Sequence, residues 1–245
     1  MTLARRRLWV IAGGVTALLL VIWWSGNDLI RLVQSNRPSV AHGTASDGWL
    51  ENGKRLPTSG ANFHAYSRLG ALLGRASVHG RVRDVLLAAY AELATRRPDI
   101  EWIYGEMGWP SGGPFPPHRT HENGTSVDLM VPVLDRDGRP AALPTGPLVK
   151  FGYAIDFDAS GRWKGLRVDF PAVAEHLLVV DSIARVRGIP VARVILTPDY
   201  QDELRQSELG RRALATIPWM VGRPWIRHDE HYHIDFAVPG RPAER

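Results

Sequence analysis

A charge-free apolar run near the N-terminus is the feature that most constrains this chain. It extends from Leu8 to Trp24, 17 residues, directly after three arginines at positions 5–7. A membrane-spanning helix needs about 17 to 25 apolar residues, whereas a cleaved secretory signal has about 7 to 15 and ends in a small-residue cleavage site, which Trp23, Trp24 and Ser25 do not provide. We therefore predict an uncleaved signal anchor over residues 8–24, with residues 1–7 in the cytoplasm, because arginines favour the cytoplasmic side and tryptophans the interface. The alternative is a buried core helix.

The composition restricts what the rest of the chain can be. Its 245 residues include no cysteine, which excludes disulfides, cysteine nucleophiles, iron–sulfur clusters and thiolate zinc sites. Any metal must therefore be bound by nitrogen and oxygen. The formal net charge is only +5, and the basic residues are spread along the chain, so we expect no nucleic-acid partner.

The pattern of apolar and turn-forming residues predicts one domain after the anchor. Residues 25–48 are rich in Ser, Gly, Asn and Pro and are expected to form a tether, so that the domain covers residues 49–245. Glycines and prolines between 106 and 123 predict a shaped loop. Apolar spacing predicts helices over 78–93, 171–187 and 199–217, and strands over 100–104, 126–133, 192–197 and 232–238. This irregular order indicates an α+β fold with a small antiparallel sheet, packed by helices and long loops.

Histidines carry the strongest chemical signal. Five of the nine fall in two clusters, which are His118 with His121, and His228 with His231 and His233. Asp128 follows His121 by seven positions, and a strand would direct His231 and His233 to the same face. Catalytic zinc is commonly held by three His, Asp or Glu ligands with a fourth position open to water. We therefore predict a zinc site formed by His121, Asp128 and His233. The alternative is that all three are structural.

Two sequence blocks carry a family resemblance. They are GEMGWPSGGPFPPHRTHENGTSVDLMVPV over 105–133 and GRPWIRHDEHYHIDF over 222–236. They resemble the penicillin-insensitive murein endopeptidases. The shared features are a GxMGxPxGG segment, an H-x-x-H pair followed by V-D, an RPW tripeptide and a final H-x-x-H-x-H motif. That family belongs to the zinc peptidases that include lysostaphin-type enzymes, D-Ala-D-Ala dipeptidases and the hedgehog signalling domain.

The resemblance implies both an activity and residue roles. The activity would be zinc-dependent hydrolysis of peptide cross-links in peptidoglycan, at D-Ala–meso-diaminopimelate bonds and at bonds between two diaminopimelate residues. Carried over by position, the zinc ligands would be His121, Asp128 and His233. His231 would stand near the attacking water as the base, with His118 and His228 as further active-site groups. The alternatives are that His118 caps carbonyls in its loop and that His228 is solvated beside Arg227 and Asp229.

The sequence departs from the family pattern in ways that keep alternatives open. Glu230 stands three residues before His233, and this E-x-x-H spacing is how the related D-Ala-D-Ala dipeptidases and D,D-carboxypeptidases place a catalytic carboxylate. Glu230 is thus a second candidate base, although regular strand alternation would point it away from His233. Ile234 and Asp235 stand where the murein endopeptidases carry Val and Arg, and the disulfides of those relatives are absent. A D,D- or L,D-carboxypeptidase acting on uncross-linked stems, or a non-catalytic zinc-binding module, are therefore the alternatives.

Further expectations concern the surroundings of the site and the cell. Glu106 is either a surface residue or the orienting partner of a ligand, and Arg119, Arg223 and Arg227 are expected to guide substrate carboxylates. His176 is expected on a helix surface. Trp109 and Trp225 are expected to pack, with the alternative that either lines the cleft. The anchor would place the catalytic domain in the periplasm at the inner (cytoplasmic) membrane. There it could open the wall locally for a secretion system or another envelope-spanning complex.

Overall fold

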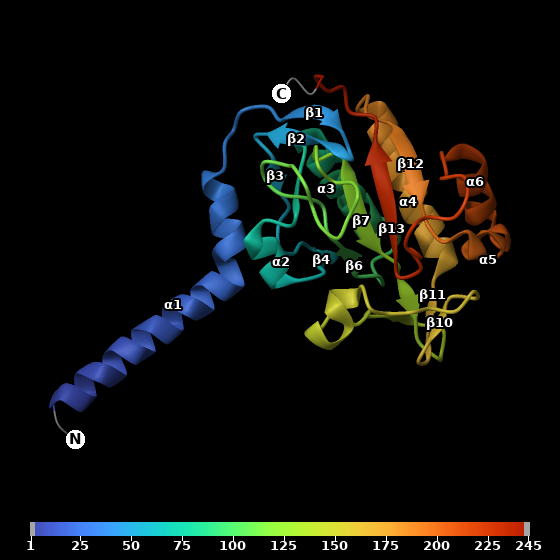
Figure 1. Ribbon diagram of the computed structural model, residues 1–245. Coiled ribbons are helices and arrows are strands. Elements are labelled where there is room, and N and C mark those ends of the chain that lie inside the picture. The colour runs from blue at the N-terminus through green and yellow to red at the C-terminus, as the bar shows by residue number, and fades with distance from the viewer. Residues whose placement is uncertain (1–2, 243–245) are drawn as a thin grey trace.

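The computed structural model describes residues 3–242 and shows a long helix leading into one α+β body (Figure 1). The helices are α1 (Leu3–Val33), α2 (Arg68–Leu73), α3 (Gly80–Arg96), η1 (Pro147–Gly152), α4 (Phe170–Val186), η2 (Pro198–Tyr200), α5 (Gln201–Arg205) and α6 (Glu208–Thr216). The strands are β1 (Val40–Thr44), β2 (Asp47–Glu51), β3 (Lys54–Arg55), β4 (Phe63–Ala65), β5 (Ser77–Val78), β6 (Trp102–Tyr104), β7 (Ser126–Met130), β8 (Val133–Leu134), β9 (Pro140–Ala141), β10 (Arg162–Trp163), β11 (Leu166–Val168), β12 (Val191–Ile195) and β13 (His231–Phe236).

A five-stranded sheet in the order β12-β13-β7-β6-β4 forms the centre of the fold. Its pairs are antiparallel except β4 with β6, which are parallel. The register of β13 on β7 places His233 opposite Asp128 and Asp235 opposite Ser126. Residues directly opposite one another share a face. His231, His233 and Asp235 of β13 therefore lie on the same face of the sheet as Asp128 of β7.

The other face of the sheet is covered by α3 and α4, which pack against each other behind it (Figure 1). Both helices were predicted, and their buried residues repeat at helical spacing. Tyr232, Ile234 and Phe236 of β13 point into this core together with Val127 and Leu129 of β7, and all five are buried. Strand alternation thus separates an apolar core face from a polar site face on the same two strands.

Two predicted elements and the predicted position of one side chain differ from the structure. The helix expected over 199–217 is divided into η2, α5 and α6, because Ser207 accepts a hydrogen bond from the Gly210 N–H and starts a new helix as its N-cap. The strand expected over 126–133 is two strands separated around Pro132, which has no N–H for a ladder. His176, expected on a helix surface, is only 1 % exposed because it lies on the face of α4 that packs on the core.

The N-terminal region also differs from the expectation. Within the described residues, α1 is the one helix long and apolar enough to cross a membrane, and the qualifying stretch runs from Trp9 to Val33. That stretch is almost entirely exposed, which argues against a buried core helix. The segment 25–48, expected to be a loose tether, instead contains the end of α1 and most of the antiparallel hairpin of β1 and β2. Its polar side chains form specific contacts with the body, described below.

Candidate functional site

The site face of the sheet forms the floor of a pocket of about 450 Å³. Its walls come from α2, from the loop around His118, from the segment 150–153 and from the loop around Trp225. His118, His228, His231 and His233 all line the pocket. The two sequence-distant histidine clusters are therefore brought together, as predicted from their spacing.

Asp128 stands at the centre of the cluster and is fully buried. Burial alone would raise the pKa of its carboxyl, but the surrounding histidines outweigh this and hold that pKa well below its usual range. Five side-chain atoms surround the two oxygens. Oδ1 lies 2.9 Å from His233 Nδ1 and 3.3 Å from His121 Nε2, and Oδ2 lies 3.2 Å from the Tyr153 hydroxyl, 3.5 Å from His118 Nδ1 and 3.7 Å from His231 Nε2.

His121 directs an unpaired nitrogen at this carboxylate. Its Nδ1 is 3.0 Å from the Met107 carbonyl oxygen, an acceptor, so Nδ1 carries the proton. Burial lowers the pKa of His121, which leaves Nε2 as a lone pair with no hydrogen-bond partner. Two electron-rich atoms, Nε2 and Asp128 Oδ1, thus face each other in a buried place. A cation between them would satisfy both, which is the arrangement expected of a metal site.

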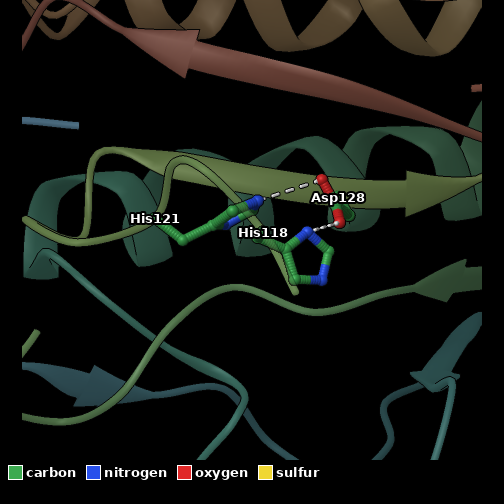
Figure 2. A group of neighbouring side chains, drawn as sticks. All are labelled: His118, His121 and Asp128. Atoms are coloured by element: carbon green, nitrogen blue, oxygen red, sulfur yellow. Dashed lines mark ion pairs between the residues drawn. The ribbon is translucent and has the colours of Figure 1, made fainter. Parts of the chain in front are cut away.

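His118 approaches the other oxygen of Asp128 in a similar way (Figure 2). Its Nε2 lies 2.6 Å from Glu106 Oε2 and donates to it, so Nδ1 faces Asp128. His118, His121 and Asp128 place one ligand atom each within 4.8 Å of the others, and this group could hold a metal ion. His121 and Asp128 are common to this group and to the predicted ligand set, which has His233 in the place of His118.

His233 contacts two carboxylates at once. Its Nδ1 lies 2.9 Å from Asp128 Oδ1 and its Nε2 lies 2.9 Å from Asp235 Oδ1. Burial would lower the pKa of His233, but these two hydrogen bonds raise it to about 9. Asp235 is itself fixed by Ser126 Oγ and by the Arg193 guanidinium. A carboxylate behind a histidine is the usual way in which proteins orient a metal-binding imidazole.

The sequence interpretation missed this role of Asp235. The signal was present, because positions 231, 233 and 235 of one strand share a face. We treated Asp235 only as a departure from the family pattern.

His231 and Glu230 act as a pair in the structure. The Glu230 Oε1 atom lies 2.8 Å from His231 Nδ1, which leaves Nε2 directed toward Asp128. Burial would lower the pKa of His231, but the neighbouring Glu230 and Asp128 charges raise it. Of the two candidate bases, His231 thus faces the pocket and Glu230 lies behind it.

His228 is a pocket residue rather than a solvated one. It is buried in the left-handed conformation, with φ 52°, and its ring lies 4.6 Å from that of His231. The Nδ1 atom lies 2.8 Å from the Ile226 carbonyl oxygen and donates to it, which leaves Nε2 as an acceptor. Burial lowers the pKa of His228 to about 4, so the ring is neutral near pH 7.

A second polar network supports His118 from behind. Glu106, which could have been a surface residue, is buried, and its carboxylate accepts hydrogen bonds from the Tyr66 hydroxyl, the Arg75 guanidinium and His118. Burial raises the pKa of Glu106, but these donors outweigh it and lower that pKa to about 2. Glu106 is therefore an anion that fixes the orientation of His118.

Tyr153 links the two networks and was not recognised from the sequence. Its hydroxyl accepts a hydrogen bond of 2.7 Å from the Glu106 N–H and donates one of 3.2 Å to Asp128 Oδ2. Two non-glycine residues just before it, Lys150 and Phe151, have left-handed φ angles of 46° and 59°. Such strained conformations are commonly kept where function requires them, but no sequence pattern marked this segment.

The arginines expected to guide substrate separate into two kinds. Arg223 pairs with Asp199, and Arg227 pairs with Asp156 and Asp229, so their charges are already compensated. Arg119 lines the pocket and lies over the Trp225 ring, 4.8 Å from its centre. Trp225, expected to pack, is 52 % exposed and forms part of the pocket wall.

The comparisons with known proteins agree with this geometry. No curated protein matches the chain. The sequence model of the penicillin-insensitive murein endopeptidases matches residues 41–244, which is most of the chain and includes every site residue named above. The chain belongs to the penicillin-insensitive murein endopeptidase family.

Proposed function

We propose that this protein is a zinc-dependent endopeptidase that hydrolyses peptide cross-links in peptidoglycan. The observation that carries the proposal is the buried, unpaired Nε2 of His121 facing the Asp128 carboxylate. Asp128 in turn contacts His118, His231 and His233, which line the pocket. The match to a murein endopeptidase family supports the reaction class. The bonds expected to be cut are those between D-Ala and meso-diaminopimelate, and those between two diaminopimelate residues.

The donor set fits zinc, because all available groups are imidazoles and carboxylates. His121, Asp128 and His233 would hold the ion, with Asp235 orienting His233. His118 is the competing third ligand, since its Nδ1 also faces Asp128. When bound, zinc polarises a peptide carbonyl as a Lewis acid and makes water more acidic.

His231 is placed to move protons in this reaction. Glu230 holds its Nδ1, so Nε2 can take a proton from the attacking water and return it to the departing amine. If His233 is the third ligand, a doubly protonated His118, held at Nε2 by Glu106, can donate its Nδ1 hydrogen to a developing negative charge. His228 presents an acceptor and suits binding of a substrate N–H. Because Glu230 contacts His231, the E-x-x-H spacing no longer favours a carboxypeptidase.

The charge of the pocket suits a substrate with free carboxylates. Arg119 and Lys150 both line it, and neither forms an ion pair with another described residue. Peptide stems of peptidoglycan carry such carboxylates, and cationic side chains bind them by charge-assisted hydrogen bonds.

We further propose that α1 anchors the protein in the inner membrane with the catalytic domain in the periplasm. The arginines at positions 5–7 favour a cytoplasmic N-terminus. An anchored hydrolase reaches only nearby wall, which suits local remodelling around a secretion system or another envelope complex. Uniform distribution of a tagged protein around the cell, independent of any such complex, would contradict that last step.

The activity is tested by incubating the protein with purified sacculi and, separately, with monomeric muropeptides, and identifying the products by mass. Loss of cross-linked dimers that a chelator abolishes and zinc restores is the expected result. Trimming of monomers alone would establish a carboxypeptidase instead. If His121→Ala, His231→Ala and Glu230→Ala proteins all release peptides as the parent does, the catalytic scheme is wrong. Zinc affinities of His233→Ala and His118→Ala proteins decide between the two candidate third ligands.

A further inference from the structure

The C-terminal third of α1 is bound to the catalytic body instead of leading into a free tether. Asn27 is buried, and its side-chain amide donates hydrogen bonds to the Leu56 carbonyl and to Thr58 Oγ1. Asp28 accepts a hydrogen bond from the Thr58 N–H. Arg55 donates back to the Asn27 side-chain oxygen. A buried polar side chain with this many partners fixes the position of its helix.

The end of α1 is held by a second set of contacts. The Lys54 ammonium donates to the backbone carbonyls of Ser35 and Arg37, just beyond the helix. The Gln34 side chain accepts a hydrogen bond from the Arg55 N–H. Cations near the carboxyl end of a helix also stabilise it electrostatically. No freely rotating segment therefore separates α1 from the body.

Helix α2 packs against α1 and also lines the catalytic pocket. A Cβ added at Gly26 of α1 would lie 2.7 Å from Leu72 of α2, so the two helices touch closely there. The Arg68 guanidinium of α2 lies 4.4 Å from the ring centre of Trp24. Leu69 and Leu73 of the same helix line the catalytic pocket. Figure 1 shows α2 between α1 and the central sheet.

The contact between α1 and α2 lies at the end of the predicted membrane span. Trp24 ends the charge-free run, and tryptophans at the end of a membrane span lie at the lipid–water interface. The contact with α2 is made by Trp24 and Gly26, so α2 lies at that interface. Packed helices are about 8 to 10 Å apart, which places the pocket wall within roughly one helix diameter of the anchor.

We infer that α2 rests on the membrane surface and holds the catalytic pocket at the level of the lipid headgroups. This rests on the proposed anchoring of α1 and deepens the proposed function, since the substrate then consists of cross-linked stems close to the membrane. The ligand of this surface is a lipid bilayer. Leu69 and Leu73 are 40 % and 59 % exposed, and Arg68 supplies a cation beside them. Exposed leucines next to an arginine suit the boundary between acyl chains and anionic headgroups.

The absence of cysteine allows a direct test on the full chain. Single cysteines at Leu73→Cys, Val15→Cys and Val221→Cys receive an environment-sensitive fluorophore. Each protein is then reconstituted in phosphatidylethanolamine–phosphatidylglycerol vesicles that contain a headgroup spin-labelled quencher. The Val15 label reports insertion of α1 by the blue shift of its emission, because mid-span it lies about 15 Å from the headgroup quencher. Val221, which is 95 % exposed on the body, is the control position for quenching. We expect several-fold stronger quenching at Leu73 than at Val221.

A flexible Gly-Ser insertion between Trp24 and Ser25 tests whether the joint causes this placement. The insertion leaves Asn27 and Asp28 docked on the body but disconnects the body from the span. Quenching at Leu73 should fall to the Val221 level while the emission of the Val15 label stays blue-shifted. Hydrolysis of soluble cross-linked muropeptides by the unlabelled insertion variant should be unchanged.

Equal quenching at Leu73 and Val221 in the parent chain overturns the inference. Unchanged quenching at Leu73 after the insertion shows that α2 binds the bilayer by itself, which supports its placement and contradicts only the role of the joint. A Val15 label whose emission is not blue-shifted also overturns the inference, because α1 is then not inserted. None of these results touches the catalytic proposal, which the muropeptide digestion reports separately.

Discussion

Strand β13 presents its two faces to opposite environments, and each face has a buried histidine at its centre. On the site face, His233 lies between the carboxylates of Asp128 and Asp235. On the core face, Tyr232 donates its hydroxyl hydrogen to Nδ1 of His176 on α4. The rings of Trp102 and Tyr90 pack around His176.

The difference shows how surroundings determine what the same side chain can do. Carboxylate neighbours raise the pKa of His233 to about 9 despite burial, whereas burial among aromatic rings lowers the pKa of His176 to about 3. The first environment stabilises positive charge, of a proton or of a metal ion. The second excludes it. The four predictions below test this contrast, beginning with the largest expected effect.

Replacing Asp128 with Asn should abolish most metal binding and activity at the site face. The carboxylate is the one anion shared by His121, His233 and His118, so its removal takes away the charge that a metal ion needs. Mutation of a residue that hydrogen-bonds to a metal ligand typically lowers activity by roughly 10- to 100-fold. Because Asp128 is itself a proposed ligand, we expect hydrolysis of cross-linked muropeptides to fall by more than this. Zinc binding, measured by competition with a chromophoric chelator, should fall in parallel.

The matched control is Asp137→Asn, an exposed carboxylate outside the pocket. It should leave both activity and zinc binding unchanged. An Asp128→Asn protein that binds zinc as tightly as the parent would contradict the proposed ligand.

Replacing Asp235 with Asn should have the next largest effect. The amide can still contact His233 Nε2, but it has no charge to stabilise the imidazole as a ligand. We expect zinc affinity to decrease by about 10- to 100-fold. Ser126→Ala, which removes only one hydrogen bond to Asp235, should cost less. An unchanged affinity in Asp235→Asn would favour His118 over His233 as the third ligand.

The sequence predicted the site face better than its supporting groups. His121, Asp128 and His233 could be proposed as ligands because metal chemistry restricts residue type and spacing, and the α+β fold followed from the irregular order of predicted helices and strands. Tyr153 could not be found, because its contact with Asp128 depends on the left-handed backbone at Lys150 and Phe151. The docking of α1 was also missed, because Asn27 and Asp28 read as ordinary polar residues unless their partners at 54–58 are known.

The core face makes stability depend on pH through His176. Its folded pKa of about 3 lies below the ordinary value of 6.5, so between these values the unfolded state binds more protons. This contribution to stability is therefore complete above pH 6.5 and is lost as the pH falls below it. From pH 7.5 to pH 5 the loss should be about 2 kcal/mol, at about 1.4 kcal/mol per pKa unit.

Denaturant unfolding of the full chain in detergent at both pH values measures this loss. In His176→Gln the difference between the two pH values should shrink by that amount. Tyr232→Phe removes the hydroxyl but no group that titrates in this range, so it should cost the same at both pH values. An equal pH dependence in parent and His176→Gln would contradict the assignment.

The smallest effect is expected for Tyr153→Phe, which sharpens the contrast by removing a neutral donor from the site face. The change deletes one hydrogen bond to Asp128 and leaves the Glu106 N–H without its acceptor, but Tyr153 lines the pocket, so water can replace the hydroxyl. Stability should fall by about 1 kcal/mol and zinc affinity by less than about tenfold.

Tyr104→Phe is the matched control, because its hydroxyl donates to the Pro57 carbonyl away from the site. It should cost similar stability and leave zinc affinity unchanged. If both variants weaken zinc binding equally, Tyr153 acts only through stability and does not position Asp128.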